Sequence, residues 1–556
     1  MERLQHKVWP PGRPHDVPAA DWTLNDNLFR NVAATPDKPA LVFYNRVTTY
    51  AQLGNQVERT AGYLQQVCGV KAGDRVAVYL QNSPQFVVAF YGIIRAGGVA
   101  VPINPMNLTA ETDYIVEDAD IRTVMTAQDR VETLEPLLAQ GILDHVIVSA
   151  YSEALPDTPP AGIPASIAEP KAALPDAFTE WSVMLDAGHA PTPFDRNPED
   201  LAVMPYTSGS TGRGKGCMHT HQTTLHATRC MIDWFDLRRD DVFLAVAPMF
   251  HVVGLQAGLN SAIEAGGTAV ILPRWDRDIA AGLIREFGVS AWPCVPTMLI
   301  DFLNREDLKE DDLATLRVLW GGGIAMPEAV AKKLQDMTGL TFLEGYGMTE
   351  TIAPSTANPP HLPKPQCGGV PVFNTDVAIV DPDTLERMPT GEIGEILISG
   401  PQVMLGYWNN DAANEEAFVQ IDGQRFIRSG DLGRVTEQGY VYIVDRLKRM
   451  INASGYKVWP TEVEAKLYHH PAIEEACIIS TQDPYRGETV KAVVVLKPGA
   501  ALAEKELAKW AHDQMAAYKV PRKLEIVDAL PKSGSGKVLW RELQEQENAK
   551  TKETVE

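Results

Sequence analysis

The sequence has 556 residues, of which 45% are hydrophobic and 22% charged, and a formal net charge of −22 from 50 Lys and Arg against 72 Asp and Glu. This balance is typical of a soluble globular protein, and the length predicts at least two domains, because single cores stop growing at about 250–300 residues. The negative field disfavours nucleic acid and anionic lipid as main partners, although a local basic cleft can still bind an anionic substrate.

Cysteine usage and the N-terminal segment favour a cytoplasmic protein. The six cysteines lie far apart, no C-x-x-C pair offers zinc-ligand spacing, and so large a chain does not depend on disulfides. The first residues, MERLQHKVWPPGRPHD, carry charge and proline where a signal peptide needs an apolar run. No apolar stretch reaches the about 18 residues of a membrane span, so we expect no integral membrane segment.

Short β-rich runs alternate with helix-like stretches up to about residue 390. The segments Tyr50–Gln66 and Pro84–Ala96 carry apolar residues at helical spacing. Strands are predicted at Arg75–Leu80, Val99–Ile103, Val242–Ala247, Thr268–Leu272 and Arg317–Trp320. Because these strands are almost wholly apolar, the alternation favours an α/β architecture with largely buried sheets.

The pattern changes after about residue 390, where a small α+β module is predicted. Its strands are expected at Glu395–Ser399, Gly439–Val444, Ala476–Ser480 and Lys491–Leu496. A charged run, Asp445–Arg449, separates two of these strand signals and marks the junction. We therefore expect an N-terminal domain over residues 1–447, a C-terminal domain over 448–541 and a polar, disordered tail over 542–556.

A glycine-rich segment, MPYTSGSTGRGKG, ends at Gly216 and nearly spells a nucleotide-binding loop. A P-loop places Ser or Thr directly after its lysine, but here Lys215 is followed by glycine. Four hydroxyls precede the lysine instead: Thr207, Ser208, Ser210 and Thr211. Glycines let backbone N–H groups approach an anion, while hydroxyls and lysine add donors and charge. The pattern favours a phosphate cradle over the alternative of a flexible surface turn.

This loop resembles the phosphate loop of the adenylate-forming superfamily of acyl-CoA synthetases, adenylation domains and beetle luciferases, and the chain is most similar to fatty-acyl-CoA ligases. The family's usual proline is replaced by Gly214. Further segments match in chain order: WGGGIA (320–325), LEGYGMTE (343–350), RSGD (428–431), DRLK (445–448), GYK (455–457) and PKSGSGK (531–537). The resemblance spans roughly residues 25–541 and implies a large α/β domain with a β-barrel-like subdomain, followed by a small mobile α+β domain.

The resemblance also implies a role for each motif in binding ATP. The implied ATP-binding residues are Thr207, Ser208, Gly209, Ser210, Thr211, Gly212, Lys215, Gly322, Gly323, Tyr346, Gly347, Thr349, Asp431, Arg446 and Lys537. Among them, Tyr346 would stack on adenine and Thr349 would contact the α-phosphate, while Glu350 would hold Mg²⁺. Taken singly, each of these residues is more simply a capping, turn or surface residue, and only their combination favours the site.

The reaction implied by the resemblance has two steps. A carboxylate attacks the α-phosphorus of ATP and expels pyrophosphate, and the thiol of CoA then attacks the acyl-adenylate and releases AMP. The residues implied in catalysis are Lys537, Lys215, Thr349 and His251. Between the steps the C-terminal domain would rotate about Lys448, which exchanges Lys537 for the CoA-binding residues Gly455, Tyr456 and Lys457.

The pocket for the acid is implied at His251, Val252, Gly254, Trp320, Gly321 and Met348. His251 lies where acyl- and aryl-CoA synthetases keep a gate residue, although a satisfied core histidine is the alternative. Because no aspartate is available near it for a substrate ammonium, an apolar acid, above all a fatty acid, is favoured over an amino acid. Trp234, Trp292 and Trp320 either border this pocket and shorten it or belong to the core.

Three functions stay open at this point. The first is an acyl-CoA ligase acting on a fatty or aryl acid, with ATP, Mg²⁺ and CoA. The second is an acyl-AMP ligase that loads a carrier-protein thiol. The third is a non-catalytic nucleotide-binding protein, which the retained Lys215, Glu350, Asp431, Arg446 and Lys537 disfavour. The sequence leaves the oligomeric state open, with a homodimer as one candidate.

Overall fold

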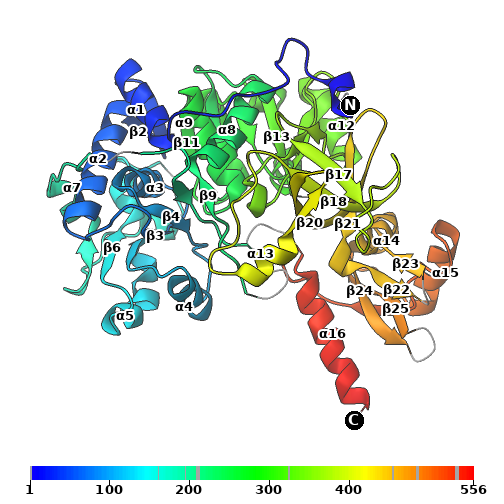
Figure 1. Cartoon of the computed structure of the whole chain (residues 1–556). Helices are drawn as coiled ribbons and strands as arrows, with labels where there is room; N and C mark the ends of the chain where they lie inside the picture. The colour runs from blue at the N-terminus through cyan, green and yellow to red at the C-terminus, as the bar shows by residue number, and fades with distance from the viewer. Residues whose placement is uncertain are drawn as a thin grey trace. The chain divides into compact units, whose positions relative to one another are not determined.

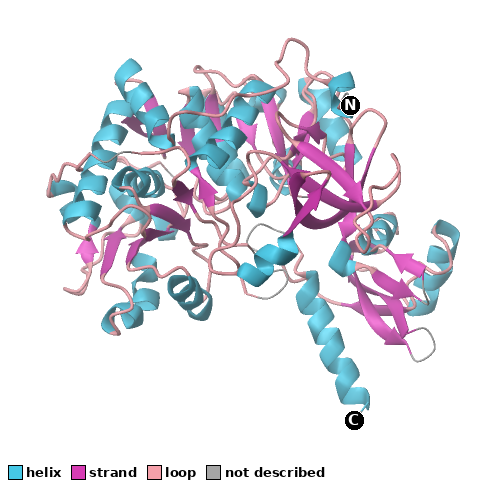
Figure 2. Ribbon diagram, in the orientation of Figure 1, coloured by secondary structure: helices cyan, strands magenta, loops and turns pink. Residues whose placement is uncertain are grey.

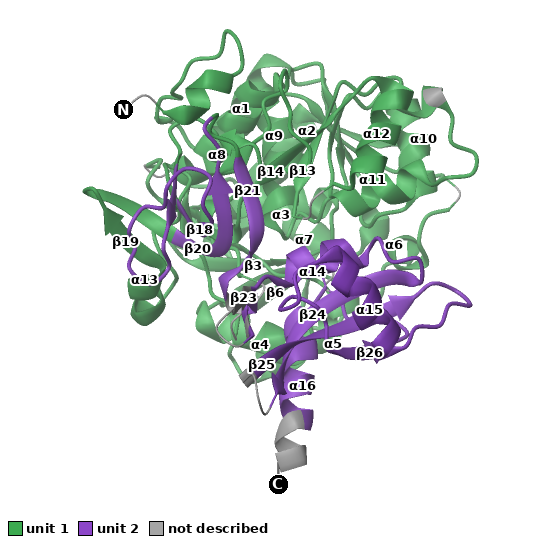
Figure 3. Ribbon diagram, turned by 90° about the vertical axis from the view of Figure 1, so that its right-hand side faces the viewer, with its two compact units in different colours: residues 1–376, 398–427, 438–440 green, residues 377–397, 428–437, 441–556 purple. Residues whose placement is uncertain are grey.

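A computed structural model gives the structure of residues 3–160, 162–193, 196–207, 213–323, 326–453, 456–483, 487–532 and 538–555. The chain divides into two compact units (Figure 3). Unit 1 comprises residues 1–376, 398–427 and 438–440, and unit 2 comprises residues 377–397, 428–437 and 441–556. Unit 2 thus begins before the predicted junction at residues 447/448, because it includes residues 377–397, 428–437 and 441–447.

The larger sheet of unit 1 has nine strands in the order β16-β15-β14-β13-β12-β10-β11-β1-β2. Of these strands, β2, β11 and β13 are labelled in Figure 1. Their bounds are β1 Pro39–Phe43, β2 Arg46–Thr49, β10 Val242–Ala245, β11 Thr268–Ile271, β12 Ala291–Pro293, β13 Val318–Gly322, β14 Phe342–Tyr346, β15 Thr356–Ala357 and β16 Val370–Pro371. The six strands from β14 to β1 are parallel, and β2, β15 and β16 add antiparallel pairs at the two edges.

A second sheet in unit 1 has seven strands in the order β7-β6-β5-β3-β4-β8-β9. Their bounds are β3 Arg75–Tyr79, β4 Val99–Pro102, β5 Thr123–Ala127, β6 His145–Ser149, β7 Thr179–Glu180, β8 Leu201–Val203 and β9 His219–Thr220. Only β9, at the edge, pairs antiparallel with its neighbour. The central strands of both sheets are buried along nearly their whole length, as apolar parallel strands must be.

Helices surround these sheets, as the alternation in the sequence predicts (Figure 2). The α-helices of unit 1 are α1 Leu24–Ala34, α2 Tyr50–Gln66, α3 Pro84–Ala96, α4 Thr109–Asp118, α5 Val131–Ala139, α6 Ala165–Ala168, α7 Trp181–Asp186, α8 His221–Phe235, α9 Ser261–Ala265, α10 Arg277–Phe287, α11 Pro296–Leu303, α12 Glu328–Thr338 and α13 Asp411–Ala417. Short η segments add η1 Leu4–Val8, η2 Gln128–Arg130, η3 Tyr151–Ala154, η4 Gly254–Asn260, η5 Glu310–Leu313 and η6 Thr349–Thr351. Helices α2 and α3 have the predicted bounds, and α3 is buried on nearly every face, which accounts for its continuous apolar sequence.

A third sheet is the counterpart of the predicted barrel-like subdomain. Its described strands run in the order β17-β18-β20-β19, with β21 also paired to β20. Their bounds are β17 Asp376–Val380, β18 Gly394–Ser399, β19 Phe418–Ile421, β20 Gln424–Val435 and β21 Val441–Arg446. The division between the units falls inside β18 and β20, so the chain leaves unit 1 and returns to it before the predicted junction.

The rest of unit 2 is the predicted α+β module. Its sheet has the order β23-β22-β25-β24, with β26 paired to β25. The elements are η7 Leu447–Arg449, β22 Ile451–Ala453, β23 Tyr456–Val458, α14 Pro460–Leu467, β24 Ile473–Asp483, β25 Gly487–Leu496, α15 Glu504–Gln514, β26 Lys523–Ile526 and α16 Trp540–Val555. Alternate apolar residues of β24 and β25 pack with α14 and α15 in one buried core.

The C-terminal tail differs from the sequence-based expectation, because it forms helix α16 rather than a disordered segment. The side-chain amide of Gln544 donates to the Ser480 carbonyl and accepts from its N–H, each at 2.8 Å. Glu547 is buried against Lys491 and Thr481. A few polar contacts therefore hold α16 against the sheet of unit 2, and composition alone does not predict this helix. Among the described residues, no helix is long and apolar enough to cross a membrane.

Candidate active site

The two strands that lead into and out of the predicted phosphate loop form an antiparallel ribbon. Tyr206 and Gly216 make a β-bridge, and the Thr207 N–H donates to the Lys215 carbonyl at 2.9 Å. The Lys215 N–H in turn donates to the Thr207 hydroxyl oxygen at 3.1 Å. The tip of the loop, Ser208 to Gly212, lies outside the described residues. The ribbon fixes where the tip starts and ends, and it places Lys215 at the base of the loop.

Helix α4 anchors this ribbon from one side. The Tyr206 hydroxyl donates to Asp118 Oδ2 at 2.6 Å, and the Tyr114 hydroxyl donates to the Gly214 carbonyl at 2.9 Å. Burial and the neighbouring Asp118 carboxylate raise the pKa of Tyr206, so the phenol stays protonated as a donor. A flexible surface turn would not need these contacts. They therefore favour the alternative, a phosphate-binding loop with an ordered base.

The tyrosine–glycine motif lies at the end of β14 and in the turn that follows. Tyr346 is the last residue of this strand, where it pairs with Thr356. Met348 and Thr351 exchange hydrogen bonds across the next turn, in which Thr349 and Glu350 begin η6. Parallel strands bring their carboxyl ends to one edge of the sheet. Tyr346, Thr349 and Glu350 are therefore presented at that edge.

A tyrosine that the sequence analysis missed joins the two motifs. The Tyr407 hydroxyl donates to Glu350 Oε1 at 2.7 Å, and Lys215 Nζ lies 4.5 Å from the centre of the Tyr407 ring. Burial and the Glu350 carboxylate raise the pKa of Tyr407, so it stays neutral between the two charged side chains. Tyr407 lies in the segment GYWNN, and no spacing or residue pattern in the sequence links it to either motif.

His219 holds the backbone of the same motif. Its Nε2 lies 2.8 Å from the Thr349 carbonyl oxygen, and its Nδ1 lies 3.3 Å from the Thr223 hydroxyl. Full burial lowers the pKa of His219 to about 4, so at neutral pH one ring nitrogen carries a proton. A carbonyl can only accept, which places that proton on Nε2 and fixes the tautomer.

Two predicted glycines of β13 are explained by strand packing. A Cβ at Gly321 would lie 1.8 Å from the Cys294 carbonyl oxygen, and one at Gly322 would lie 2.2 Å from that of Gly345. Neighbouring backbones thus approach too closely for any side chain. Gly323, with φ of +95°, adopts a conformation that L side chains rarely take. Backbone packing and backbone conformation therefore account for these glycines at the edge of the site, without any contact to a ligand.

The structure excludes the interpretation of His251 as a buried core histidine. His251 is exposed and precedes η4, and its Nδ1 accepts the Val253 N–H at 3.3 Å. Val252 is buried, and a Cβ at Gly254 would lie 2.1 Å from the Pro248 carbonyl oxygen. The turn therefore packs tightly while its histidine is exposed, and the role of His251 as a gate residue stays a prediction.

The three tryptophans considered for the acyl pocket have different surroundings. Trp234 donates from Nε1 to the Asn358 carbonyl at 2.9 Å and packs edge-on against Trp9. Trp292 is fully buried and stacks on Trp275. Trp320, in the middle of β13, stacks on Phe235 and directly precedes the glycines of the candidate site. Only Trp320 thus adjoins the predicted pocket residues in the chain.

The predicted ribose-binding residues, Asp431 and Arg446, belong to unit 2 and are paired with each other there. They are partners in the β20–β21 ladder, and Arg446 Nε lies 3.1 Å from Asp431 Oδ1. Lys448 lies in η7, and Tyr456 and Lys457 lie in β23. Their side chains, as well as Gly455 and Lys537, lie outside the described residues, so the roles of these five residues stay predictions.

The Glu350 carboxylate fits the predicted Mg²⁺ site chemically. Mg²⁺ prefers oxygen ligands and is usually held by one or two carboxylates together with substrate phosphates. Glu350 offers a partly buried carboxylate in the same cluster as the Lys215 side chain, and the neutral Tyr407 leaves its negative charge in place. Cluster and loop together could bind a metal-bound polyphosphate.

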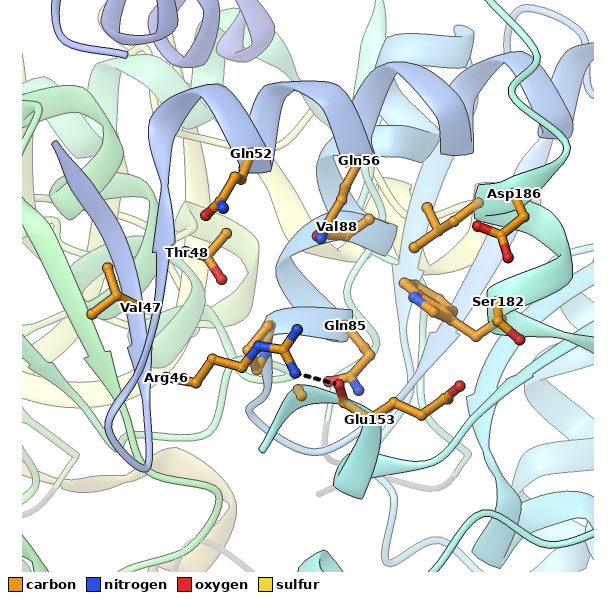
Figure 4. Close-up of a pocket in the computed structure, with 14 residues that line it drawn as sticks. Arg46, Val47, Thr48, Gln52, Gln56, Gln85, Val88, Glu153, Ser182 and Asp186 are labelled. Atoms are coloured by element: carbon orange, nitrogen blue, oxygen red, sulfur yellow. Dashed lines mark hydrogen bonds between the residues drawn. The ribbon is translucent and has the colours of Figure 1, made fainter. Parts of the chain in front are cut away.

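A cavity of about 330 Å³ between β2, α2, η3 and α7 lies apart from these residues (Figure 4). Amides and carboxylates line much of it, and at its edge Arg46 donates to the Glu153 carbonyl at 2.9 Å. None of the described candidate site residues lines this cavity. It is therefore not part of the candidate active site.

The chain matches models of two protein families. Residues 28–408 match the model for AMP-binding enzymes, and residues 462–537 match the model for the C-terminal domain of AMP-binding enzymes. Among relatives, a long-chain-fatty-acid–CoA ligase of Bacillus subtilis (strain 168) is 36% identical over 97% of both chains. A feruloyl-CoA synthase of an Amycolatopsis species is 34% identical over 92% of this chain and 97% of its own.

Solved structures are similar over nearly the whole chain. ATP-bound MatB from Rhodopseudomonas palustris has a TM-score of 0.83 and 28% identity, and the match covers 94% of this chain and 99% of that one. An o-succinylbenzoate CoA synthetase (MenE) from Bacillus subtilis, in complex with ATP and a magnesium ion, has a TM-score of 0.78 and 25% identity, with 94% and 100% covered. Both comparisons agree with the α/β architecture described above.

Proposed function

The chain belongs to the AMP-binding enzyme family, and on that premise we propose that it is an AMP-forming acyl-CoA ligase. Its substrates are ATP, CoA and an apolar carboxylic acid, most simply a fatty acid. Relatives named long-chain-fatty-acid–CoA ligase and feruloyl-CoA synthase support this class of reaction, and they span both aliphatic and aromatic acids.

The observation that carries this proposal is that Tyr407 contacts both Lys215, which lies over its ring, and Glu350, which accepts from its hydroxyl. The two charged residues come from motifs more than a hundred positions apart in the sequence. A cation from the phosphate loop and a carboxylate suited to a metal thus contact the same tyrosine, which supports a site for a metal-bound triphosphate. If the glycine-rich loop with Lys215 and the motif with Glu350 lay on opposite sides of unit 1, the ligase function would be ruled out.

In the first step, carboxylate and triphosphate repel one another, so catalysis consists mainly of positioning and charge neutralisation. Lys215 donates to the phosphates that leave, and the Thr349 hydroxyl donates to the α-phosphate. Glu350 would hold Mg²⁺, which would supply positive charge against the leaving pyrophosphate. Tyr407 and His219 act indirectly, because they hold the Glu350 side chain and the Thr349 backbone in place.

In the second step, the CoA thiol attacks the carbonyl carbon of the acyl-adenylate and AMP leaves. We assign Lys537 to the first step and Gly455, Tyr456 and Lys457 to the second. All four residues lie beyond Lys448 in the chain, so a rotation about this residue would exchange one set for the other, as in other hinge motions. Asp431 and Arg446 would hold the ribose through both steps.

The test is AMP release from ATP with a panel of fatty and aryl acids, measured with and without CoA. We expect release that depends on both an acid and CoA, together with an acyl-CoA product. Turnover without CoA in the presence of a carrier protein would favour the acyl-AMP ligase instead. No AMP with any acid would leave only a nucleotide-binding protein.

A further inference from the structure

A buried carboxylate of β14, that of Glu344, holds two separate backbone segments. Glu344 lies two residues before Tyr346 in the segment LEGYGMTE and is only 7% exposed. Its Oε1 accepts the Gln366 N–H at 2.7 Å, and its Oε2 accepts the Met326 N–H at 3.2 Å. A buried carboxylate is costly unless its oxygens are hydrogen-bonded, so Glu344 and the two backbone segments stabilise one another.

The first of these segments follows the predicted ATP-binding glycines. Gly321 is the register partner of Glu344 in the β13–β14 ladder. Gly322 and Gly323 come next, and Met326 lies three residues beyond Gly323. The Met326 N–H is therefore a point at which the Glu344 side chain holds the chain that leaves these glycines.

The second segment, residues 358–367, joins β15 to β16. Asn358 donates its backbone N–H to the Glu344 carbonyl at 2.9 Å, and its side-chain amide donates to the Cys367 carbonyl at 2.8 Å. The Gln366 N–H donates to the Glu344 side chain. Main-chain and side-chain oxygens of Glu344 thus hold both ends of this segment.

The Glu344 side chain lies on the same face of the sheet as that of Tyr346, because side chains alternate along a strand. Tyr346 is the partner of Thr356 in the β14–β15 ladder, and the segment 358–367 follows directly after β15. The carboxylate thus joins the backbone around the predicted ATP-binding glycines to the strand that presents Tyr346.

We propose that Glu344 is a positioning residue for ATP, whose carboxylate fixes the glycines of β13 and Tyr346 relative to one another before the nucleotide binds. The inference rests on the proposed function, which assigns Gly322, Gly323 and Tyr346 to ATP. Glu344 acts through the backbone that it holds and need not contact the nucleotide. Its loss should therefore weaken the binding of ATP and leave the binding of the acid and of CoA near wild type.

The protonation state of Glu344 decides how many N–H groups it can accept. Burial raises the pKa of Glu344 to about 7, although the N–H groups of Met326, Gln366 and Cys367 favour the carboxylate form. In a protonated carboxyl one oxygen donates instead of accepting, so one of these N–H groups loses its acceptor. ATP should therefore bind more weakly as the pH falls through 7, by up to about tenfold per pH unit.

The charged side chains that the structure describes around this carboxylate face away from it. Lys364 Nζ lies 5.6 Å from the centre of the Tyr440 ring, and His361 and Glu328 are exposed. Among the described residues of β13, β14 and β15, Tyr346 is the only other titratable side chain. The titration therefore depends on burial and on the backbone donors, not on a neighbouring charge.

A second buried carboxylate of unit 1 offers a matched control. Burial also raises the pKa of Glu264, in α9, to about 7. Glu264 accepts from the side-chain amide of Asn27 in α1, and Arg30, Arg229 and Asp233 are the charged residues that act on it. Glu264→Gln thus removes the same kind of carboxylate from the same unit without changing the contacts of Glu344.

The experiment is calorimetric titration of MgATP between pH 8 and 6, without acid or CoA, on the full chain. We expect the affinity of the wild type to fall toward pH 6. Glu344→Gln keeps the shape but turns an NH₂ group toward a backbone N–H, so it should bind MgATP about tenfold more weakly at pH 8. Its affinity should then change less with pH, while Glu264→Gln should follow the wild type. The titration of ATP itself affects all three proteins equally.

Steady-state kinetics distinguish positioning from a general loss of structure. In Glu344→Gln the KM for ATP should rise about tenfold, while kcat and the KM for the acid stay near wild type. Glu344→Asp keeps the charge but shortens the side chain by one methylene. It should weaken ATP binding and keep the pH dependence, and it tests the inference even if Glu344→Gln does not fold. Thermal unfolding shows which variants are folded.

Three results would overturn the inference: equal pH dependence of MgATP affinity in the wild type and Glu344→Gln, equal rises in the KM for ATP and for the acid in folded Glu344→Gln, or the same loss of MgATP affinity in Glu264→Gln. An enzyme that releases no AMP with any acid overturns the proposed function instead. The two failures are distinguishable, because the titration of MgATP tests Glu344 without turnover.

Discussion

The two units hold their candidate site residues in different ways. In unit 1, Lys215, Tyr407 and Glu350 come from three separate segments and meet through tertiary contacts. In unit 2, Asp431 and Arg446 face each other because β20 and β21 are neighbours in one sheet. The first arrangement depends on the packing of a whole domain, and the second on the register of one pair of strands. A substitution in the unit 1 cluster should therefore also affect the function of its neighbours, while a substitution in the unit 2 pair should affect only the ligand group that this pair contacts.

The largest effect is expected from Lys537→Ala in unit 2. Lys537 is proposed to reach the reacting phosphate, and the loss of such a cation should slow acyl-adenylate formation by about 10²–10³-fold. Thioester formation from supplied acyl-adenylate should be retained, because Lys537 is assigned to the first step only. Single-turnover assays of each half-reaction measure the difference.

Lys532→Ala is the matched control for that variant. Lys532 lies in the same unit and forms a surface ion pair with Glu475 at 2.6 Å. Both half-reactions should stay near wild type in this variant, because exposed pairs contribute little. Equal losses in both half-reactions of Lys537→Ala would contradict the division of labour between the steps.

A smaller effect is expected from Tyr407→Phe, which tests the coupling within unit 1. The variant keeps the ring beneath Lys215 and removes the hydroxyl that holds Glu350. A hydrogen bond to a charged group is worth about 1.5–3 kcal/mol, so MgATP affinity should fall by about tenfold or more. Calorimetric titration of MgATP measures it without turnover, and Tyr407→Leu, which also removes the ring, should bind still more weakly. Unchanged MgATP binding in both variants would show that Tyr407 does not couple Lys215 and Glu350 to nucleotide binding.

Arg446→Gln should have a weaker and more local effect. The Arg446 side chain is 38% exposed, and such pairs are typically worth about 1 kcal/mol or less. We expect KM for ATP to rise by about fivefold or less, with KM for the acid unchanged. Parallel measurements of both KM values check this. A large change in KM for the acid would contradict the local character of the unit 2 pair.

The last expected effect is on the stability of unit 1 at acid pH and not on catalysis. Burial lowers the pKa of His219 to about 4 from the usual 6.5 of a histidine. As the pH falls, the unfolded chain therefore takes up a proton at this residue before the folded chain does. Stability from this group is present above about pH 6.5 and is lost as the pH falls toward 4, by on the order of 1 kcal/mol per pH unit.

His219→Gln keeps an N–H donor for the Thr349 carbonyl but cannot titrate. Urea unfolding of both proteins between pH 7 and 4 should show that the variant loses less stability on acidification. Parallel curves would mean that His219 does not contribute to the acid sensitivity. His221 and His226, whose pKa values burial also lowers to about 4, contribute equally to both proteins.

Local sequence patterns were enough to predict the layers of the fold and to identify the motifs. The apolar runs predicted the buried strands, and α2 and α3 have the predicted bounds, because period and burial are local properties of a chain. Fixed spacing within each motif likewise made Lys215, Tyr346 and Glu350 recognisable. Local patterns did not reveal α16, since its anchors to Ser480 and Lys491 lie more than fifty residues away.

Only the tertiary structure decided which residues meet. Tyr407 belongs to no pattern in the sequence, and its role depends on a contact across 57 positions to Glu350. The three tryptophans are equivalent in the sequence, but strand register turns Trp292 and Trp320 to opposite faces of one sheet. A side chain's neighbours across a sheet or between segments follow from packing, which a local pattern does not encode.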